Sequence, residues 1–377
     1  MSAPPDIAEQ AALKHALRLA ERGRYKVSPN PMVGAVLLRH GTTIAEGWHK
    51  EVGGPHAEAE ALAATPDASG ATLCVTLEPC DHQGRTPPCT EALIAAGVRR
   101  VVACHRDPDA RVRGGGFERL RAAGIDVVSG FLVDEAVRLN WKYLVAKVKG
   151  RPAVTLKWAM SLDGHIATRS GDSRWITGSR SHRWSLTLRE EHDAILVGSG
   201  TILADDPRLN RRIGLTARPN VRVVLDRRLR VAPTAALFGE EGKVLIYTAA
   251  ATLAGAGERA RALEERGAEV IGLADPTPQA ALADLGERDV QSLLVEGGGE
   301  VFAAFVGAGL YDRVEVACAP LLLGGREAPT PLGGAGVEKL SEALRLDELE
   351  TRRSAPDVLL GTFRKGCLPE LSASVAG

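Results

Sequence analysis

The sequence predicts an α/β protein of two domains, and three observations support that prediction. The chain has 377 residues, which is about twice the usual size of one domain. Short apolar segments that favour strands alternate with segments of helical periodicity, as in a mostly parallel sheet covered by helices. A breaker sequence, KGRP at 149–152, divides the chain. We therefore expect one domain over residues 1–149 and a second over residues 150–377.

The first half begins with a helix over 6–23, where apolar residues recur at helical spacing and Gly23 ends the pattern. Farther along, apolar segments predict strands, and alanine-rich or amphipathic segments predict helices. The expected strands cover 32–38, 43–48, 72–77, 100–104 and 125–128, and the expected helical segments cover 57–64, 91–96, 116–123 and 134–149.

The second half repeats the alternation without an internal repeat. Its expected strands lie near 153–158, 194–198, 221–225, 243–247, 291–295 and 312–318, and its expected helices lie near 179–190, 258–266, 278–285 and 300–306. The last residues, 372–377, are small, and we expect them to fray.

Composition narrows the function classes. Forty-seven basic residues balance forty-seven acidic ones, which disfavours a long nucleic-acid footprint. No apolar run approaches the ~18 residues that a membrane-spanning helix needs, and the first residues do not resemble an export or transit peptide. We expect a cytoplasmic enzyme that acts on a small molecule, binds neither nucleic acid nor membrane, and forms a homo-oligomer.

The six cysteines are too sparse for a disulfide framework and suit a reducing compartment. Cys74, Cys104 and Cys318 lie in or beside apolar strand patterns, so we expect them in the core. Cys367 is expected at the surface. Cys80 and Cys89 follow prolines in a polar loop, which makes metal binding the question for these two residues.

Three segments of the first half carry metal-binding side chains: an H-A-E triplet beginning at His56, a P-C pair ending at Cys80, and a second P-C pair ending at Cys89. One imidazole and two thiolates are three ligands for tetrahedral Zn²⁺, with water in the fourth position, as in catalytic zinc sites. Because zinc lowers the pKa of water from ~15.7 to about 7, hydroxide forms at neutral pH. Glu58 would carry protons to the ring nitrogen and the leaving amine. The pattern predicts hydrolytic deamination.

Residues two apart on a helix point in nearly opposite directions, so His56 and Glu58 share a pocket only if a helix begins there. Pro55 supports such a start. Likewise, the T-P-P sequence at 86–88 predicts that Cys89 lies in the first turn of another helix. Backbone N–H groups and the helix dipole favour a thiolate at that position.

Each of these elements is weak alone, because buried cysteine is often only a small apolar side chain. In this order they match the zinc deaminase signature H-x-E…P-C…C. Two alternatives stay open. A structural zinc clip would add a fourth protein ligand such as His82, and a nucleic-acid deaminase would act on a base in tRNA or single-stranded DNA with the second half as a binding module.

Eight residues separate Cys80 from Cys89, whereas about two separate the cysteines of nucleoside and nucleic-acid deaminases. The segment EPCDHQGRTPPC at 78–89, with NPMVG at 30–34, resembles the bacterial bifunctional riboflavin-biosynthesis deaminase-reductases. That family usually has Ser at the position of Asp81. The resemblance covers about residues 8–365 and implies a diaminopyrimidinone ribosylamino 5′-phosphate as substrate. It also implies a cytidine-deaminase-like N-terminal domain and a dihydrofolate-reductase-like C-terminal domain.

For the first domain the resemblance implies a pocket around the metal. Asn30, His49, His82 and Arg85 match its substrate-binding residues, and a guanidinium such as that of Arg85 binds phosphate oxygens in a fork.

For the second domain the resemblance rests on four segments in family order, KWAMSLDG at 157–164, SRWITG at 173–178, GTILADDP at 200–207 and LVEGGG at 294–299. It implies hydride transfer from NADPH to C1′ of the opened ribosylamino group. Lys157, Asp205 and Glu296 match residues near the reacting sugar, and the acid among them is not assigned. The implied substrate residues are Lys157, Ser173, Arg189, Leu209, Arg212 and Glu296. The implied cofactor residues are Ala159, Trp175, Thr201, Asp205, Gly298, Gly299, Glu300, Val301, Phe302, Ala303 and Ala304.

Overall fold

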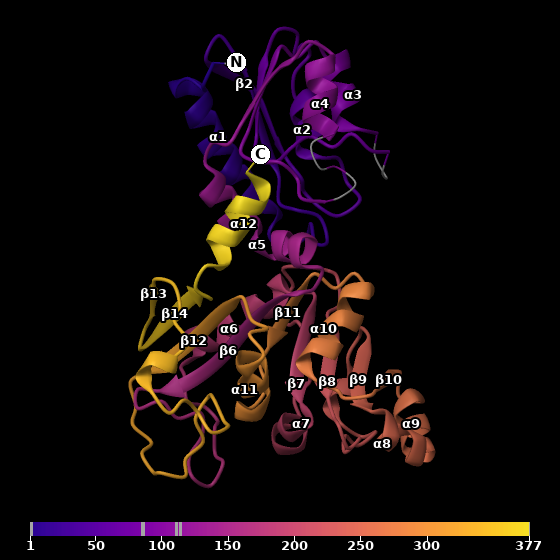
Figure 1. The fold of residues 1–377 in the computed structure, drawn as a ribbon, viewed down its shortest axis with the longest axis vertical. Helices are drawn as coiled ribbons and strands as arrows, with labels where there is room; N and C mark the ends of the chain where they lie inside the picture. Colours follow the sequence, from indigo (N-terminus) through magenta and orange to yellow (C-terminus); the bar gives the residue numbers. More distant parts are fainter. Residues whose placement is uncertain (1–2, 84–86, 110–111, 113–114, 377) are drawn as a thin grey trace. The chain divides into compact units, whose positions relative to one another are not determined.

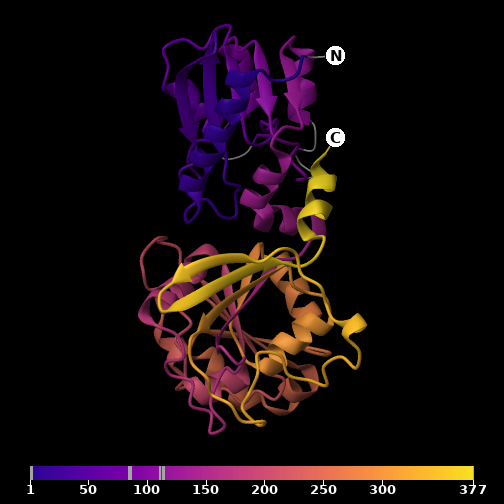
Figure 2. The same cartoon turned by 90° about the vertical axis from the view of Figure 1, so that its left-hand side faces the viewer.

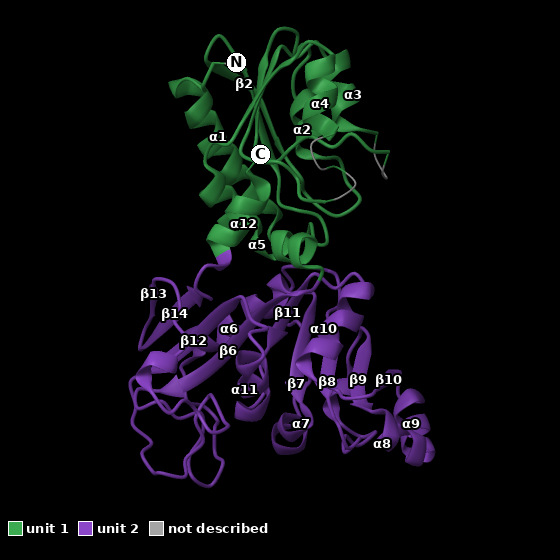
Figure 3. Cartoon of the chain, in the orientation of Figure 1, with its two compact units in different colours: residues 1–150, 368–377 green, residues 151–367 purple. Residues whose placement is uncertain are grey.

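The computed structural model describes residues 3–83, 87–109, 112 and 115–376. The chain forms two compact units, residues 1–150 with 368–377, and residues 151–367 (Figure 3). Each unit is built around one sheet. In the described part of the chain, no helix is both long enough and apolar enough to cross a membrane.

The first unit contains a five-stranded sheet in the order β2-β1-β3-β4-β5 (Figure 1). Strand β1 is antiparallel to β2 and β3, and β3, β4 and β5 are parallel. The strands are β1 Gly34–Arg39, β2 Thr42–Trp48, β3 Thr72–Val75, β4 Arg100–Ala103 and β5 Asp126–Ser129. The helices are α1 Ile7–Ala20, the 3-10 turn Glu21–Gly23, α2 Ala57–Ala63, α3 Cys89–Ala95, α4 Gly115–Ala122, α5 Val133–Lys149 and α12 Cys367–Val375.

Helices cover both faces of this sheet, because successive strand residues point to opposite sides. Leu37 and Leu73 pack with side chains of α2, α3 and α4. Val36 and Cys74 point the other way and pack with α1 and α5. The strands are therefore buried on both faces, which explains their nearly unbroken apolar sequences.

The carboxyl-terminal residues differ from the expectation. Helix α12 continues to Val375 and lies beside α5 in both views (Figures 1 and 2). Ser372 Oγ donates to Asp134 Oδ1 at 2.8 Å, and Leu371 and Cys367 are fully buried. The predictions of a frayed end after 372 and of an exposed Cys367 are wrong, because this helix buries its apolar side. The segment belongs to the first unit, although the expected division at residue 150 assigned it to the second.

The second unit contains a nine-stranded sheet in the order β10-β9-β8-β7-β11-β6-β12-β14-β13. The strands from β10 to β12 in this order are parallel, and β14 and β13 continue antiparallel. The strands are β6 Ala153–Ser161, β7 Ala194–Gly198, β8 Val221–Leu225, β9 Val244–Ala249, β10 Ala268–Leu273, β11 Ser292–Val295, β12 Arg313–Ala319, β13 Glu350–Ser354 and β14 Asp357–Phe363. The helices are α6 Ser179–Glu191, α7 Ser199–Asp205, α8 Ala250–Gly255, α9 Gly257–Glu264, α10 Pro278–Glu287 and α11 Gly299–Gly307, with 3-10 turns at Ala236–Gly239 and Leu340–Glu342.

Two clusters make the core of this unit. Helices α10 and α11 pack on one face of the sheet, where Phe302 and Phe305 meet Leu156 and Leu196. Helices α7 and α9 pack on the opposite face against Ile195 and other side chains of β7, β8 and β9. Because seven neighbouring strands are parallel, their carboxyl ends meet at one edge. In open sheets of this kind, ligands bind at that edge.

Candidate active sites

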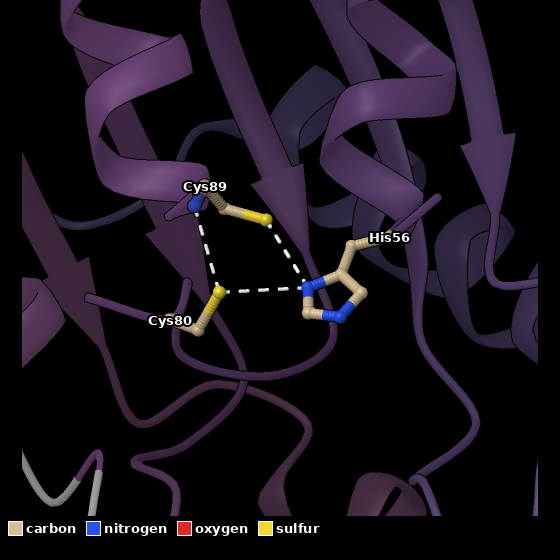
Figure 4. Close-up of side chains that lie close together, drawn as sticks. All are labelled: His56, Cys80 and Cys89. Atoms are coloured by element: carbon tan, nitrogen blue, oxygen red, sulfur yellow. Dashed lines mark hydrogen bonds between the residues drawn. The ribbon is translucent and has the colours of Figure 1, made fainter. Parts of the chain in front are cut away.

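The side chains of His56, Cys80 and Cys89 converge in the first unit (Figure 4). His56 Nδ1 lies 3.5 Å from Cys80 Sγ and 3.3 Å from Cys89 Sγ. In a tetrahedral site with Zn–S near 2.3 Å and Zn–N near 2.0 Å, the N–S edge is about 3.5 Å. Both nitrogen-to-sulfur distances therefore match those of a tetrahedral zinc site, and all three donor atoms lie within 4.8 Å of one another.

Local sequence explains the convergence. His56 is the N-cap of α2 with extended backbone angles, and Cys89 is the first residue of α3 after Pro88. A Cβ on Gly47 would lie 2.5 Å from Ala57 O, so glycine lets the start of α2 lie directly on β2. The predictions that helices begin at both ligand segments are confirmed.

The Cys80 segment is held from behind by two residues that the sequence analysis missed. Glu78 accepts hydrogen bonds from the backbone N–H groups of Asp107 and Phe117 at 3.1 and 3.0 Å. A Cβ on Gly116 would lie 1.9 Å from Pro79 O. Helix α4 therefore abuts the turn that presents Cys80, and only tertiary contacts reveal it.

The two thiols are electrostatically coupled. A hydrogen bond from Cys89 lowers the pKa of the Cys80 thiol to about 4 against the effect of burial, and the same bond together with burial raises the pKa of Cys89. Two adjacent thiols thus hold one negative charge between them. A divalent cation removes the penalty for the second charge, which fits a zinc site.

Glu58 lies beside these ligands in the first turn of α2 and is 3% exposed. Burial raises the pKa of its carboxyl to about 7, although the His56 charge opposes this. Since a proton carrier works best when its pKa is near the operating pH, Glu58 has the environment that a general acid and base requires.

Asn30 and His49 form a hydrogen-bonded pair next to the ligand cluster. His49 Nδ1 lies 2.9 Å from Pro55 O, and His49 Nε2 lies 3.0 Å from Asn30 Nδ2. A carbonyl oxygen only accepts, so Nδ1 carries the proton and Nε2 accepts from the Asn30 amide. Burial lowers the pKa of His49 and favours this neutral form. The network leaves Asn30 Oδ1 as an acceptor for a ligand.

The inserted loop between the cysteines is described in part. Asp81 Oδ1 accepts from Thr90 Oγ1 at 2.5 Å, and the buried His82 Nδ1 has no hydrogen-bond partner among the described residues. Arg85 lies outside the described residues. Over the described chain, the only group of metal-binding side chains is the His56 cluster, and His82 does not belong to it. The geometry disfavours the structural clip with His82 as fourth ligand.

In the second unit a charged cluster lies at the carboxyl edge of the sheet. Arg189 on α6 donates from Nε and Nη2 to both carboxylate oxygens of Glu296, at 3.1 and 2.6 Å. Burial alone would raise the pKa of Glu296, but Arg189 and Lys157 lower it. Burial also lowers the pKa of the Lys157 ammonium, against the effect of Glu296. Lys157 and Glu296, two of the three residues predicted near the sugar, therefore lie together, and Glu296 engages the charge of Arg189, which was predicted as a substrate residue.

The α6 helix also brings His182 to this cluster, a residue that the sequence analysis missed. His182 lies seven residues before Arg189, so both occupy one face of the helix. Its ring contacts Trp175 at a centroid distance of 4.8 Å. Burial and the charges of Lys157, Arg212 and Arg189 lower the pKa of His182. The seven-residue spacing between His182 and Arg189 was the sequence signal that could have placed His182 at this site.

The other predicted residues of this unit lie on nearby segments. Asp205 ends α7, and its backbone oxygen accepts from Arg174 Nη2 at 2.6 Å. Leu209 is buried and its carbonyl accepts from Asn220, while the exposed Arg212 donates to Asn210 Oδ1 at 2.7 Å. Ser173 is half-buried and Ala159 lies on β6.

Three consecutive glycines follow β11, and glycine is required at each position for a different structural reason. A Cβ on Gly297 would lie 2.7 Å from Val197 Cα, and a Cβ on Gly299 would lie 3.1 Å from Thr330 O. Gly298 has a positive φ of 55° and is exposed, and the closest atom to a Cβ there is Thr201 Oγ1 at 3.6 Å. Of the three glycines, Gly298 is thus the one whose backbone is exposed and has no atom closer than 3.6 Å to a Cβ.

Helix α11 begins at this point and carries the remaining predicted cofactor residues. Phe302 is buried and packs against Trp158, so its side chain belongs to the core. Glu300 and Ala304 are exposed, and Val301 and Ala303 are half-buried.

A basic segment that the sequence analysis missed follows β8 at the same edge. Arg227, Arg228 and Arg230 are exposed. Arg230 Nη2 donates to Ser199 Oγ at 2.9 Å, and Ser199 begins α7 beside Thr201. The topology places this segment two strands from Gly298, which corresponds to about 10 Å.

Comparisons with known proteins match each unit to a protein family. Residues 7–105 match the family model of the cytidine and deoxycytidylate deaminase zinc-binding region, and residues 152–360 match the RibD C-terminal domain. The predicted fold class is confirmed, with a cytidine-deaminase-like first unit and a reductase-family second unit.

Full-length relatives match both units together. The riboflavin biosynthesis protein RibD of Escherichia coli is 40% identical over 365 residues, which covers 92% of this chain and 97% of that protein. The Acinetobacter baumannii RibD structure is 36% identical with a TM-score of 0.86 and covers 94% of this chain and 98% of its own. A Thermotoga maritima structure, named as a diaminohydroxyphosphoribosylaminopyrimidine deaminase and 5-amino-6-(5-phosphoribosylamino)uracil reductase, is 36% identical with a TM-score of 0.82 and covers 95% and 99%. The chain therefore belongs to the RibD family of riboflavin-biosynthesis enzymes, in which a zinc-dependent deaminase and an NADPH-dependent reductase share one polypeptide.

Proposed function

We propose that this enzyme converts 2,5-diamino-6-ribosylamino-4(3H)-pyrimidinone 5′-phosphate in two steps. The first unit replaces the 2-amino group by oxygen from water and releases ammonia. The second unit then reduces the ribosyl side chain to give 5-amino-6-ribitylaminouracil 5′-phosphate. The observation that carries the proposal is the cluster of His56, Cys80 and Cys89 beside the buried Glu58.

In the deaminase step, His56, Cys80 and Cys89 hold the zinc ion. The ion supplies Lewis acidity and lowers the pKa of water at its fourth position to about 7. Glu58 takes one proton from the attacking water and delivers it to the pyrimidine ring nitrogen. It then takes the proton of the newly added hydroxyl and passes it to the amine, so that the C–N bond breaks, ammonia leaves and the carbonyl forms. The raised pKa of Glu58 supports both directions of proton transfer.

Asn30, His49, His82 and Arg85 bind the substrate in this step. His49 fixes the Asn30 amide with its oxygen free, and this oxygen accepts a hydrogen bond from an N–H or amino group of the pyrimidine. The unpartnered Nδ1 of His82 supports a second polar contact.

In the reductase step, Lys157, Glu296 and Asp205 handle charge and protons at the opening sugar. NADPH supplies the hydride to C1′. Arg189 holds Glu296 ionised through two hydrogen bonds. We therefore assign the main phosphate contact to Arg212, whose charge no carboxylate of the described residues engages in this way. Ser173 and Leu209 complete the substrate contacts.

Gly298 and the first turns of α11 would hold the cofactor. Helix N-termini bind phosphate through backbone N–H groups, and the exposed Gly298 supports a close approach there. Ala159, Trp175, Thr201, Asp205 and residues 299–304 line the remaining path. We assign selection of NADPH over NADH to Arg228 and Arg230, because a guanidinium pairs with a phosphate but gains nothing comparable from a hydroxyl. Asp275 already engages the charge of Arg227.

We also propose a cytoplasmic homo-oligomer. The six described cysteines are free, which suits a reducing compartment. The segment 320–349 carries exposed leucines, including Leu322, Leu340 and Leu344, which a monomer would leave in water. Analytical ultracentrifugation of the wild-type enzyme and of the Leu340→Asp variant tests this proposal. The wild type should sediment as an oligomer and the variant should sediment as a smaller species, and a monomeric mass for both proteins would contradict it.

The test of the two-step function uses the diamino substrate with and without NADPH. Ammonia release without NADPH is expected, together with NADPH oxidation only after deamination. Cys80→Ala should abolish ammonia release but leave reduction of the supplied deaminated intermediate, and Asp205→Asn should do the reverse. Loss of both activities in one folded, zinc-loaded variant would contradict two independent sites.

A further inference from the structure

We propose that Asn140, buried inside α5, is a positioning residue for the deaminase pocket and acts through Asn30. This inference rests on the proposed substrate role of Asn30. Asn140 lies 110 residues away in sequence and belongs to no metal-binding or signature segment. Its side chain nevertheless connects α5 to the loop that presents Asn30.

The connection is a pair of hydrogen bonds to one backbone residue. Met32 N–H donates to Asn140 Oδ1, and Asn140 Nδ2 donates to Met32 O, both at 2.8 Å. Asn140 is 3% exposed. Its amide thus makes the two bonds that a neighbouring strand residue would otherwise make.

The loop needs this support because its sequence is poor in donors. Pro29 and Pro31 have no N–H group, and β1 begins only at Gly34. A Cβ on Gly34 would lie 2.0 Å from Ala16 O, so that end of the loop is clamped against α1. Asn140 supplies the second anchor, two residues from Asn30.

The helix departs from regular geometry where it supplies this anchor. Asn140 has φ −103° and ψ 19°, and it is the residue of α5 with non-helical backbone angles. Asparagine is a poor residue for a helix interior. Asn140 is a buried polar side chain at a kink, and the loop near the ligand cluster satisfies both its donor and its acceptor. Its placement therefore serves the loop rather than the helix.

The contacts form a continuous series. Asn140 fixes Met32, and Asn30 then meets His49 Nε2 at 3.0 Å. The backbone N–H of His49 donates to Val33 O at 2.9 Å, which ties the His49 residue to the same loop. Movement of Met32 would therefore misplace the Asn30 oxygen that we propose contacts the substrate. His56 and Cys89 would stay held by α2 and α3, and Cys80 by the turn that abuts α4.

The experiment is a double-mutant cycle of Asn30→Ala and Asn140→Ala in the full chain, read by deaminase KM, kcat and zinc content. Asn140→Ala is expected to raise KM about tenfold, with kcat within about threefold and one zinc per chain retained. In the Asn30→Ala background the Asn140→Ala effect on KM should vanish, because the second residue acts through the first.

Two further variants control for folding. Asn140→Asp keeps the acceptor for Met32 N–H, and an intermediate rise in KM is expected, so this variant keeps the test decisive if Asn140→Ala fails to bind zinc. Asn220→Ala removes a buried amide of the second unit that bonds Leu209 O, and deaminase KM should not change.

The other outcomes separate failure of this inference from failure of the proposed role of Asn30. An unchanged KM in folded Asn140→Ala, or KM effects that multiply independently in the double variant, overturns the inference. Zinc loss in both Asn140 variants also overturns it, because the residue would then support the whole unit. If Asn30→Ala alone leaves KM unchanged, the proposed substrate role of Asn30 fails instead.

Discussion

The two active sites of this chain are built in different ways. The deaminase ligands lie in two helix starts and one turn, within 34 residues of sequence, and both nitrogen-to-sulfur distances match a tetrahedral zinc site. The reductase residues come from the ends of β6 and β11, from α6 and α7, and from loops, and the topology of the sheet brings them together. A metal site is thus encoded mainly by local capping signals, whereas a site at a sheet edge is encoded by the whole fold.

This difference predicts how each site responds to substitution. A change in the deaminase cluster should remove chemistry and leave the fold intact, because each ligand is held by its own helix or turn. A change in the reductase cluster should alter both activity and stability, because its charges are buried and paired.

The largest effect is expected for Glu58→Gln. The amide keeps the shape but carries no proton, so kcat for ammonia release should fall about 10³-fold, while zinc content and reductase activity stay at the wild-type level. Steady-state ammonia release and metal analysis measure this. A kcat within tenfold of wild type would exclude Glu58 as the proton carrier.

The next effect is on stability. Glu296→Gln leaves Arg189 and Lys157 without their buried carboxylate, and the second unit should lose about 3 kcal/mol of unfolding free energy at pH 7. Denaturant unfolding followed by fluorescence measures the loss.

The loss should depend on pH in a defined direction. The native pKa of Glu296 lies below its ordinary value of 4.5, so its contribution is present above about pH 4.5 and disappears as the pH falls through the native pKa. The stability difference between wild type and Glu296→Gln should therefore shrink at low pH. A difference that grew below pH 4.5 would contradict the ion pair.

A smaller effect is expected for Gly297→Ala. The added methyl would lie 2.7 Å from Val197 Cα, and overpacking of this kind costs about 1–3 kcal/mol. Gly307→Ala is the matched control, because a Cβ there meets nothing within 4 Å. Thermal unfolding should give a lower melting temperature for Gly297→Ala than for Gly307→Ala. Equal melting temperatures would contradict a close contact between residue 297 and Val197.

The smallest effect concerns cofactor choice. Replacing Arg228 and Arg230 by Ala should weaken NADPH binding about tenfold and leave NADH binding within about twofold. Equilibrium titration of cofactor fluorescence measures both dissociation constants. An equal loss for the two cofactors would mean that these arginines do not contact the 2′-phosphate.

The sequence was sufficient for the deaminase cluster and for most of the sheet, because prolines mark helix starts and doubly covered strands are almost continuously apolar. It was insufficient for β13, whose residues Glu350–Ser354 form a mostly exposed edge strand without an apolar pattern. It also missed α12, because the small residues of this helix resemble a frayed end, and only the fold shows that Leu371 and Val375 are buried.

The same reason explains the missed site residues. Asn140, Gly116 and Arg230 act through tertiary contacts, across 108 residues in the bond from Asn140 to Met32, and no local pattern distinguishes them from ordinary helix or loop residues. The resemblance also implied that Arg189 binds substrate, but it did not indicate that Glu296 engages the Arg189 guanidinium through two hydrogen bonds.

The central claim is that His56, Cys80 and Cys89 are the complete protein ligand set of a zinc ion with an open position. X-ray absorption at the zinc edge of the purified enzyme tests this most directly. The account predicts one zinc per chain, with two sulfurs near 2.3 Å and two nitrogen or oxygen neighbours near 2.0 Å, one of which exchanges when a small anion is added. A zinc shell filled by four protein donors, or one that keeps both sulfurs in Cys80→Ala, would contradict it.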